Sequence, residues 1–515
     1  MMTPDFPESI PLRPFKPAYD PYGRRGEESA PPSRTRPPAA AGPAIPISAR
    51  DRALRRVIEF GLLALLVFSP LPIGSVEDGP ILVIEVAAVV LAILYFLMDK
   101  PPHINAALKP KLRWPRMFFG LLLAFMAVQI VPLPAVVVRL LSPRAFALRQ
   151  QFLPAGAGGW TSLSLLPART FRSLLEFLAY ILIGFLIVRT ITHTRQARRL
   201  IAVVVAMGVF QVFYGLFEIT QSAPRLLFYP KVFMLGSPTG TFVNRNHFSG
   251  YLEMIIPLAI GLLLSRAGAF SLQGRKWREK IALLTAKGAF VNLLVLAALF
   301  ILFLGVLKSN SRSGTFILAL ILLLVFGLSA YAFSAARYQQ LWVRAFLRAM
   351  VGMIVLLVLY FGFDATVRRF SADNLLQEGR PKYWSSVLTM IGDFPLVGTG
   401  YGTFPSVFPV YEDPGLENPV VHAHNDYLEN TAELGLLGFG LLMAGVLALG
   451  VIAFRSWSER HNPEVKGLVL GCLVAVAAML FHSVTDFNLH IPANVLLFTV
   501  VLSLAFGTAF YQKAS

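Results

Sequence analysis

Long apolar stretches recur along most of this 515-residue chain, and they constrain its fold more than any other feature. The hydrocarbon core of a bilayer is about 30 Å thick, so a helix needs about 20 apolar residues to cross it. The chain therefore predicts an all-α integral membrane protein with about twelve transmembrane helices. The predicted spans lie near residues 57–74, 80–98, 117–132, 173–191, 200–220, 248–265, 288–307, 313–333, 345–363, 433–454, 467–483 and 492–511.

The composition supports the same fold class. Hydrophobic residues make up 56% of the chain and charged residues only 14%, whereas about a quarter of the residues in soluble domains are charged. The mean hydropathy is +0.63. The chain has a single cysteine, Cys472, which lies in an apolar run, so an intramolecular disulfide is excluded.

The first 50 residues differ from the rest, because they contain twelve prolines and few large aliphatic side chains. Such a segment cannot bury enough apolar surface to fold, so a disordered tail is predicted. Its proline-rich stretches leave a partner-binding role open. No secretory signal peptide is expected, because the first apolar run starts near Val57. The predicted organisation is a tail, nine spans, a large outward-facing loop and three further spans, at residues 1–50, 51–363, 364–432 and 433–515.

Basic residues predict the orientation of the spans. With the tail inside, 32 of the 46 Lys and Arg residues fall in inward-facing segments and 14 in longer outward-facing ones. The positive-inside rule then places both termini in the cytoplasm, with the chain in a bacterial inner membrane. Topology and anionic lipid also account for the net charge of +18, so no nucleic acid partner is expected.

Unusual polar residues gather in the connections that are predicted to face outward. Three of the eight histidines, at positions 103, 193 and 461, are expected on the cytoplasmic side, and the other five lie in these connections. Inward-facing connections contain mainly Arg, Lys and Pro. The outward-facing strings are Gly240–Gly250, Lys308–Gly314, Gly379–Trp384, Val421–Leu428 and His482–His490.

Two of these strings also have a purely structural interpretation. Arg245 and Arg312 can serve as anchors at the membrane edge. Asn244 and Asn246 can cap the helix that follows them, and His247 can be a polar residue at the interface.

The remaining histidines have structural or metal-binding alternatives. His482 and Asp486, four residues apart, can form a hydrogen-bonded pair at a helix end. His422 and His424 can share a metal ion, but the chain offers neither a cysteine ligand set nor an HExxH spacing, so no metal is expected.

Taken together, the strings favour chemistry on an anionic substrate. The large loop holds nine acids against four basic residues, which makes Arg380 an exception there. Arg245, Arg312 and Arg380 can form a pocket for phosphate oxygens, which guanidinium groups bind bidentately. Histidines beside them can accept a proton near neutral pH. The absence of a glycine-rich nucleotide loop suits a donor that is already activated and delivered by the membrane.

At these residues the sequence resembles the superfamily of O-antigen ligases and Wzy-type polysaccharide polymerases. The resemblance covers roughly residues 160 to 510. It rests, in this order, on TFVNRNHFSGYL, SNSRSG, GRPKYWSSVLTMIGDFPLVGTGYGTF, HAHNDYLENTAELGLLG and HSVTDFNLHIPAN. It implies a GT-C-like fold with a large periplasmic loop between the ninth and tenth spans. It also implies transfer of a glycan from undecaprenyl diphosphate without a metal, a nucleotide sugar or another cofactor.

The resemblance also implies roles for individual residues. His424, followed by Asn425, matches the histidine that deprotonates the acceptor hydroxyl, and His422 competes for this role. Arg380 and Arg312 match best the arginines that hold the diphosphate. Arg245 is the next candidate to bind the diphosphate. The supporting residues of the predicted site are Asn246, His247, Asn425, His482 and Asp486.

Partners and alternatives follow from the same resemblance. The expected partners are an undecaprenyl-diphosphate-linked glycan, a glycan or lipid A-core acceptor, the bilayer and other envelope polysaccharide assembly proteins. Polymerase and ligase activity, for exopolysaccharide, O-antigen or lipopolysaccharide, both stay open. A flippase for lipid-linked oligosaccharide is the alternative, although transporters place ionisable groups near the midplane, where Glu85 and Glu218 are the main acids.

Overall fold

The computed structural model describes residues 48–99, 108–152, 159–266, 287–333, 352, 380–412 and 420–511. The predicted tail up to residue 47, His103 and the predicted span 345–363 lie outside the described residues.

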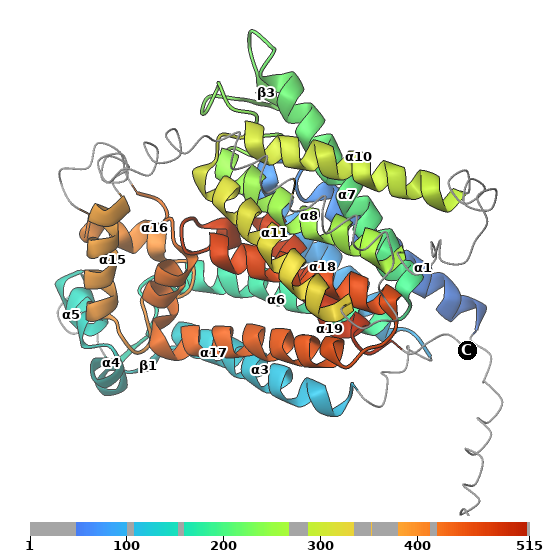
Figure 1. Cartoon of the computed structure of the whole chain (residues 1–515). Helices are drawn as coiled ribbons and strands as arrows, with labels where there is room; N and C mark the ends of the chain where they lie inside the picture. Colours follow the sequence, from blue (N-terminus) through green and yellow to red (C-terminus); the bar gives the residue numbers. More distant parts are fainter. Residues whose placement is uncertain are drawn as a thin grey trace, which may run out of the picture. The chain divides into compact units, whose positions relative to one another are not determined.

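The described chain is almost entirely helical (Figure 1). Its first half contains α1 (Ala49–Phe68), η1 (Ile73–Ser75), α2 (Asp78–Phe96), η2 (Pro110–Leu112), α3 (Arg113–Ile130), β1 (Leu133–Pro134), α4 (Ala135–Leu141), α5 (Pro143–Phe152), β2 (Trp160–Thr161), α6 (Pro167–Thr190), α7 (Thr194–Glu218), β3 (Arg225–Leu226), β4 (Tyr229–Pro230) and α8 (Arg245–Arg266). The second half contains α10 (Lys287–Lys308), α11 (Arg312–Phe333), α15 (Arg380–Asp393), α16 (Phe404–Val407), η5 (Phe408–Val410), α17 (Asp426–Ser458), α18 (Pro463–His482), η6 (Asn488–His490) and α19 (Pro492–Thr508). Both sheets are two-residue antiparallel pairs, β1 with β2 and β3 with β4.

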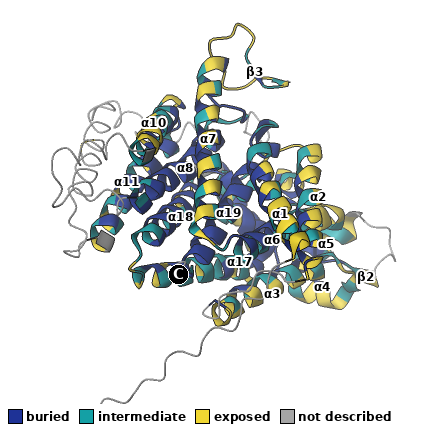
Figure 2. Ribbon diagram, turned by 90° about the vertical axis from the view of Figure 1, so that its right-hand side faces the viewer, coloured by how far each residue is buried: buried dark blue, intermediate teal, exposed yellow. Residues whose placement is uncertain are grey.

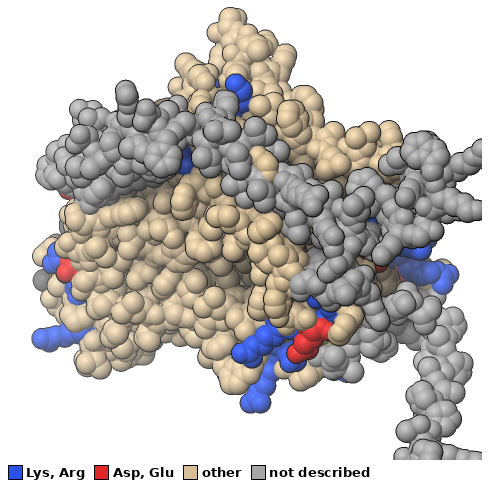
Figure 3. Space-filling model, viewed as in Figure 1, with Lys and Arg blue, Asp and Glu red and all other residues tan. Residues whose placement is uncertain are grey.

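The helices confirm the predicted class, an all-α polytopic membrane protein. Among the described residues, α2, α6, α7, α8, α10, α11, α17 and α18 are long and apolar enough to cross a membrane, and α19 is a shorter apolar helix. Helices α1 and α3 also overlap the predicted spans 57–74 and 117–132. The number of spans stays a prediction. In the view of Figure 3 a broad uncharged area lies between charged side chains near the left edge and at the lower right.

Helices α8 and α18 form the centre of the bundle (Figure 2). In α8, 94% of the apolar stretch is buried, and in α18 78% is buried. Small residues allow this close approach, since a Cβ at Gly261 would lie only 2.6 Å from the carbonyl oxygen of Gly467. Packing between membrane helices depends on such small residues because lipid supplies no hydrophobic force between helices. The α8–α18 pair is therefore packed backbone to backbone at the centre of the bundle.

Helix α17 begins seven residues before the predicted span 433–454. The Asn425 side chain caps it by accepting hydrogen bonds from the backbone N–H groups of Tyr427 (3.0 Å) and Leu428 (3.1 Å). Gly435 interrupts the helix with φ 62° and ψ 178°, a conformation that essentially only glycine adopts. A Cβ there would lie 2.4 Å from the backbone of Leu396. Thus the first turns of α17 form a separate short segment.

Much of the predicted loop 364–432 is folded where the structure describes it. Helices α15 and α16 lie with α4 and α5 at one end of the bundle (Figure 1). Tyr383, Val387, Met390, Phe394 and Phe404 contribute to a small separate core there. This end of the molecule carries the first residues of α17, where the histidine string lies.

Candidate active site

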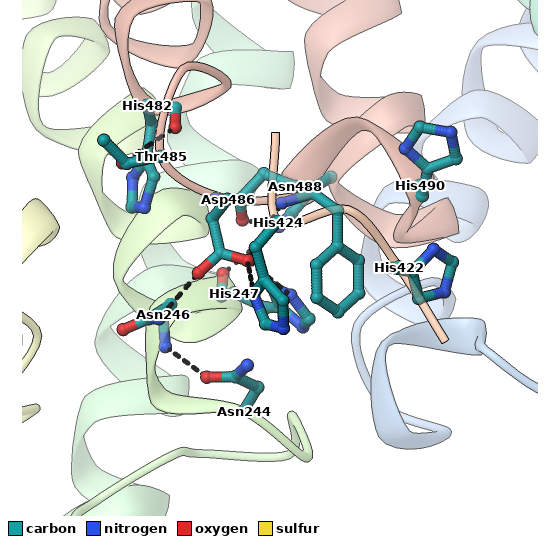
Figure 4. Close-up of polar contacts among 12 residues, drawn as sticks. Asn244, Asn246, His247, His422, His424, His482, Thr485, Asp486, Asn488 and His490 are labelled. Atoms are coloured by element: carbon teal, nitrogen blue, oxygen red, sulfur yellow. Dashed lines mark hydrogen bonds and ion pairs between the residues drawn. The ribbon is translucent and has the colours of Figure 1, made fainter. Parts of the chain in front are cut away.

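Asp486 lies at the centre of a polar cluster formed by strings that are far apart in the sequence (Figure 4). The residue is fully buried. Its Oδ1 is 3.1 Å from Nδ1 of His424, and its Oδ2 accepts a hydrogen bond of 2.6 Å from Nδ2 of Asn246. The backbone N–H of Phe487 also donates to Oδ1, at 2.9 Å. Asp486 therefore joins the loop before α19 to α8 and to the histidine string.

Asn246 extends this cluster to α11, because its Oδ1 accepts a hydrogen bond of 2.9 Å from Oγ of Ser311. The capping interpretation holds for Asn244, whose Oδ1 accepts from the backbone N–H of Asn246, but the Asn246 side chain has a different role. Arg245 begins α8 and Arg312 begins α11, so each arginine adjoins one member of this hydrogen-bonded pair. Two helix N-termini, which favour anions, meet here.

Electrostatics favour an ionised Asp486. Burial alone would raise the pKa of Asp486, but its neighbours His247 and His424 lower that pKa well below its ordinary value. Nε2 of His247 is 3.7 Å from Oδ1 of Asp486. Because an ionised carboxylate only accepts hydrogen bonds, Nδ1 of His424 is the donor. The lone pair of the neutral His424 ring then lies on Nε2, where it can accept a proton.

The backbone of His424 is unusual, with φ at 47°. Positive φ is uncommon outside glycine, and such strain costs about 1–3 kcal/mol and persists only where surrounding contacts hold it. Here the Asp486 contact and the Asn425 cap hold the residue on either side. The His424 side chain is nonetheless 32% exposed. It is thus both fixed in place and accessible.

A second cluster of histidines and carboxylates lies beside the first. Nδ1 of His422 is 2.8 Å from Oε1 of Glu429, and Nδ1 of His490 is 2.7 Å from Oδ1 of Asp426. Nε2 of His490 is also 3.5 Å from Oε1 of Glu429. Burial lowers the pKa of His490, but Glu429 and Asp426 outweigh it and raise that pKa to about 10. His490 is therefore a partly buried imidazolium between two carboxylates.

Phe487 lies between the two clusters. Its ring stacks on His422 at 4.2 Å and 14°, while His424 and His247 meet its ring edge-on at 4.8 and 4.5 Å. His422 and His424 pair with different carboxylates, which does not support a metal shared between them. The two candidate bases thus lie on the same aromatic ring but belong to different hydrogen-bond networks.

His482 is directed away from this ring. The backbone N–H of Asp486 donates to its carbonyl oxygen, but the two side chains do not form the pair that the sequence suggested. Instead, Nδ1 of His482 is 2.7 Å from Oε2 of Glu253, whose Oε1 accepts from Oγ of Ser249 at 2.8 Å. Glu253 is not among the residues predicted from the sequence, although an acid inside an apolar run is itself a signal of function.

Several other members of the site could not be singled out in the sequence. Ser311 was one serine among three in its string, and Phe487 resembled any aromatic residue at a membrane edge. Asp426 and Glu429 were counted only as loop acids. The side chain of Arg380 lies outside the described part of the chain, where only its backbone is placed, at the start of α15.

The fold and these clusters define a multi-pass membrane protein with a histidine, carboxylate and arginine site at one end of its helix bundle. Residues 297–443 match the sequence model of the O-antigen ligase family, which supports placing this chain among the O-antigen ligase and Wzy-type proteins. The matched segment runs from α10 into α17 and includes Ser311, Arg312 and both candidate bases. A search of curated proteins found no match.

Proposed function

We propose that this chain is a membrane glycosyltransferase that ligates or polymerises an undecaprenyl-diphosphate-linked glycan at the periplasmic face. The observation that carries the proposal is the contact between His424 and buried Asp486, which Asn246 and Ser311 join to the helix starts that bear Arg245 and Arg312. A base oriented by a carboxylate, next to cationic helix ends, is the equipment for displacing an anionic leaving group. We also propose an inner-membrane location with both termini in the cytoplasm.

In this mechanism His424 is the general base. Asp486 accepts the hydrogen bond from Nδ1, keeps Nε2 unprotonated, and stabilises the imidazolium that forms. The acceptor hydroxyl gives its proton to Nε2 as its oxygen attacks the anomeric carbon. The bond from that carbon to the diphosphate oxygen breaks in the same step, so a single displacement inverts the anomeric configuration.

The arginines have the second role. Arg312, Arg245 and Arg380 would neutralise the departing undecaprenyl diphosphate, which gains one negative charge because its oxygen keeps the electron pair of the broken bond. Removal of one such donor at a developing negative charge typically costs about 2–4 kcal/mol of transition-state stabilisation. No step of this displacement needs a metal or a cofactor.

The experiment is complementation of a bacterial strain that lacks this chain. Full-length chains carrying His424→Ala, His422→Ala or the control His193→Ala would be compared. His193 is exposed and lies before α7, outside both clusters. Surface glycan would be resolved on a gel, and protein in the membrane would be quantified by immunoblot.

We expect loss of glycan for His424→Ala at normal protein levels, with the control unchanged. A missing long-chain ladder would indicate a polymerase, and free polymer absent from its final acceptor would indicate a ligase. Loss with His422→Ala alone would transfer the role of base to His422. Wild-type glycan from both variants would contradict the proposal.

Transport of lipid-linked oligosaccharide is the second candidate, and the buried Glu253–His482 pair favours it. Both side chains are fully buried between α8 and α18, and ionisable pairs inside a membrane often mark transport pathways. In that case Glu253→Gln would stop movement of the lipid-linked glycan across the membrane, while His424→Ala would leave the glycan at its normal length.

A further inference from the structure

A long cavity lies between α3, α6, α17 and α19, helices that pack around it in the lower part of Figure 1. Its volume is about 490 Å³, within the range of pockets that hold small ligands. Along α6 it is lined from Ser173 to Arg189, which is about 24 Å at 1.5 Å per residue. Its walls are mainly apolar side chains, among them Phe119, Phe185 and Phe498. The shape and lining suit an extended hydrocarbon chain.

One end of this cavity is acidic. Glu176, Asp426 and Glu433 line it there, together with His490. Oε1 of Glu176 accepts a hydrogen bond of 2.7 Å from the hydroxyl of Tyr180. Burial and the nearby Glu429 raise the pKa of Glu433 to about 7, so this end carries a partial negative charge. The described residues that line it include no Lys or Arg to bind an anionic group, and the negative charge repels one. The carboxylates favour a head that donates hydrogen bonds, since bonds to carboxylates are among the stronger ones.

The acidic end is separate from the arginine-bearing helix starts. The cavity is lined by residues from α3, α6, α17, α18 and α19 and from nearby segments, but by none from the described parts of α8 or α11. Asp486 contacts α8, whereas His490, four residues later, lines the cavity. The segment between α18 and α19 therefore forms a wall, with the cationic helix starts on one side and the cavity on the other.

The opposite end of the cavity is basic but less suited to hold a head group. Arg116 is exposed there. The Arg189 guanidinium already donates to the Tyr95 hydroxyl and lies 5.4 Å from the centre of that ring. Basic residues at the inward end of helices are ordinary membrane anchors. The unusual chemistry is thus at the acidic end.

We propose that this cavity binds a glycolipid, with its hydrocarbon chain between α3, α6 and α19 and an uncharged, hydroxyl-rich sugar head at Glu176, Asp426 and Glu433. The head then lies behind the loop that carries Asp486 and His490, on the side away from the diphosphate. The assignment of this lipid as the acceptor rests on the proposed function, but its binding does not. A lipid-linked acceptor would thereby approach the site from a different side than the donor.

The test is photolabelling of the purified full-length chain in phosphatidylcholine nanodiscs. The probe is dodecyl maltoside with a diazirine at the end of its chain, and labelled peptides are identified by mass spectrometry. Unlabelled dodecyl maltoside, dodecyl phosphate and dodecyltrimethylammonium compete in separate experiments. They represent uncharged, anionic and cationic heads on the same chain.

Two variants obstruct the cavity from opposite walls. Gly120→Phe on α3 introduces a ring where a Cβ meets nothing within 4 Å, and Gly184→Leu on α6 extends from a Cβ that is 3.0 Å from Oγ of Ser503. Gly327→Phe is the matched control, because Gly327 is an equally open helical glycine on α11 that does not line the cavity. Size-exclusion chromatography verifies that each variant is folded.

We expect labelling of α3, α6 and α19 that falls at least tenfold in Gly120→Phe or Gly184→Leu and not in Gly327→Phe. Dodecyl phosphate should compete at least tenfold more weakly than dodecyl maltoside, and Glu176→Gln should narrow that difference. If dodecyl phosphate competes as strongly as dodecyl maltoside, the proposal is overturned and the cavity is assigned to the donor lipid. If dodecyltrimethylammonium competes more strongly than dodecyl maltoside, the assignment of an uncharged sugar head is overturned. Labelling that persists in both folded cavity variants would overturn the site itself. None of these readouts requires glycan transfer, so they are independent of the proposed activity.

Discussion

The two clusters on either side of Phe487 contain the same residue types but are connected differently. The Asp486 cluster extends outward through Asn246 and Ser311 to the starts of α8 and α11, and its His424 is accessible. In the second cluster, Glu429 and Asp426 bind His422, His490 and nearby backbone N–H groups. These bonds stay within the cluster, while Asp426 and His490 also line the cavity. Under the proposed function, the reactive and the supporting histidines are therefore distinguished by their connections and not by residue type.

The largest effect that distinguishes the clusters is expected from neutralising their central acids. Asp486→Asn keeps the side-chain shape but removes the charge that fixes the His424 tautomer. Glycan transfer should then fall by about 10²–10⁴-fold, the usual range for a lost general base or its orienting carboxylate. The measurement is transfer in isolated membranes, normalised to the amount of folded protein.

Glu429→Gln is the matched change in the second cluster. We expect it to lower the yield of folded chain while each folded molecule retains transfer within about tenfold of wild type. Equal loss of transfer per folded molecule in both variants would remove the distinction between the clusters.

A smaller effect, on stability, should come from His490→Gln. This change leaves Asp426 and Glu429 buried without the imidazolium between them, and loss of one partner of a buried pair typically destabilises by about 3–5 kcal/mol. The measurement is the thermal midpoint in detergent, with exposed His193→Gln as the control. An unchanged midpoint would show that His490 is not the structural centre of its cluster.

The pH dependence sharpens the same comparison. Because the pKa of His490 rises to about 10 in the fold, its stabilisation is fully present below its ordinary pKa of about 6.5 and is lost as pH rises through about 10. The gap in thermal midpoint between wild type and His490→Gln should therefore narrow between pH 7 and pH 10.5. Asp486 has a lowered pKa, so its contribution is lost in the opposite direction, as pH falls below about 4. A gap that widens toward high pH would contradict this assignment.

The smallest effect concerns the link between the two arginine-bearing helices. Asn246→Ala removes the hydrogen bonds to Asp486 and Ser311 and should reduce transfer by about tenfold, as expected for about 1–2 kcal/mol of lost hydrogen bonding. Ser311→Ala alone should cost less. A double-mutant cycle on transfer measures the coupling, and strictly additive losses would show that the link does not act as a unit.

The long apolar stretches predicted the membrane class well, because lipid imposes a minimum helix length that the sequence displays directly. Apolar stretches do not indicate the residues of α17 that precede the predicted span, since Asn425 and Gly435 act through cap geometry and backbone conformation, which have no hydrophobic pattern. The sequence grouped His424, Asn246 and Asp486 on one side of the membrane but did not pair them. Pairing depends on the close packing of α8 against α18, and glycines such as Gly261 record that packing only weakly in the sequence.

The break at Gly435 has a mechanical consequence. Membrane helices tilt when the thickness of the bilayer changes, and a continuous α17 would transmit that tilt to the residues at its start. Here the segment before Gly435 is clamped to the preceding loop, where the backbone N–H of Gly400 donates to the carbonyl oxygen of Glu433. Just after the break, the backbone N–H groups of Leu436 and Leu437 also donate to this loop, at the carbonyl oxygens of Pro395 and Leu396. The loop therefore holds both sides of Gly435, and we expect the alignment of His424 to be retained in thin and thick membranes alike.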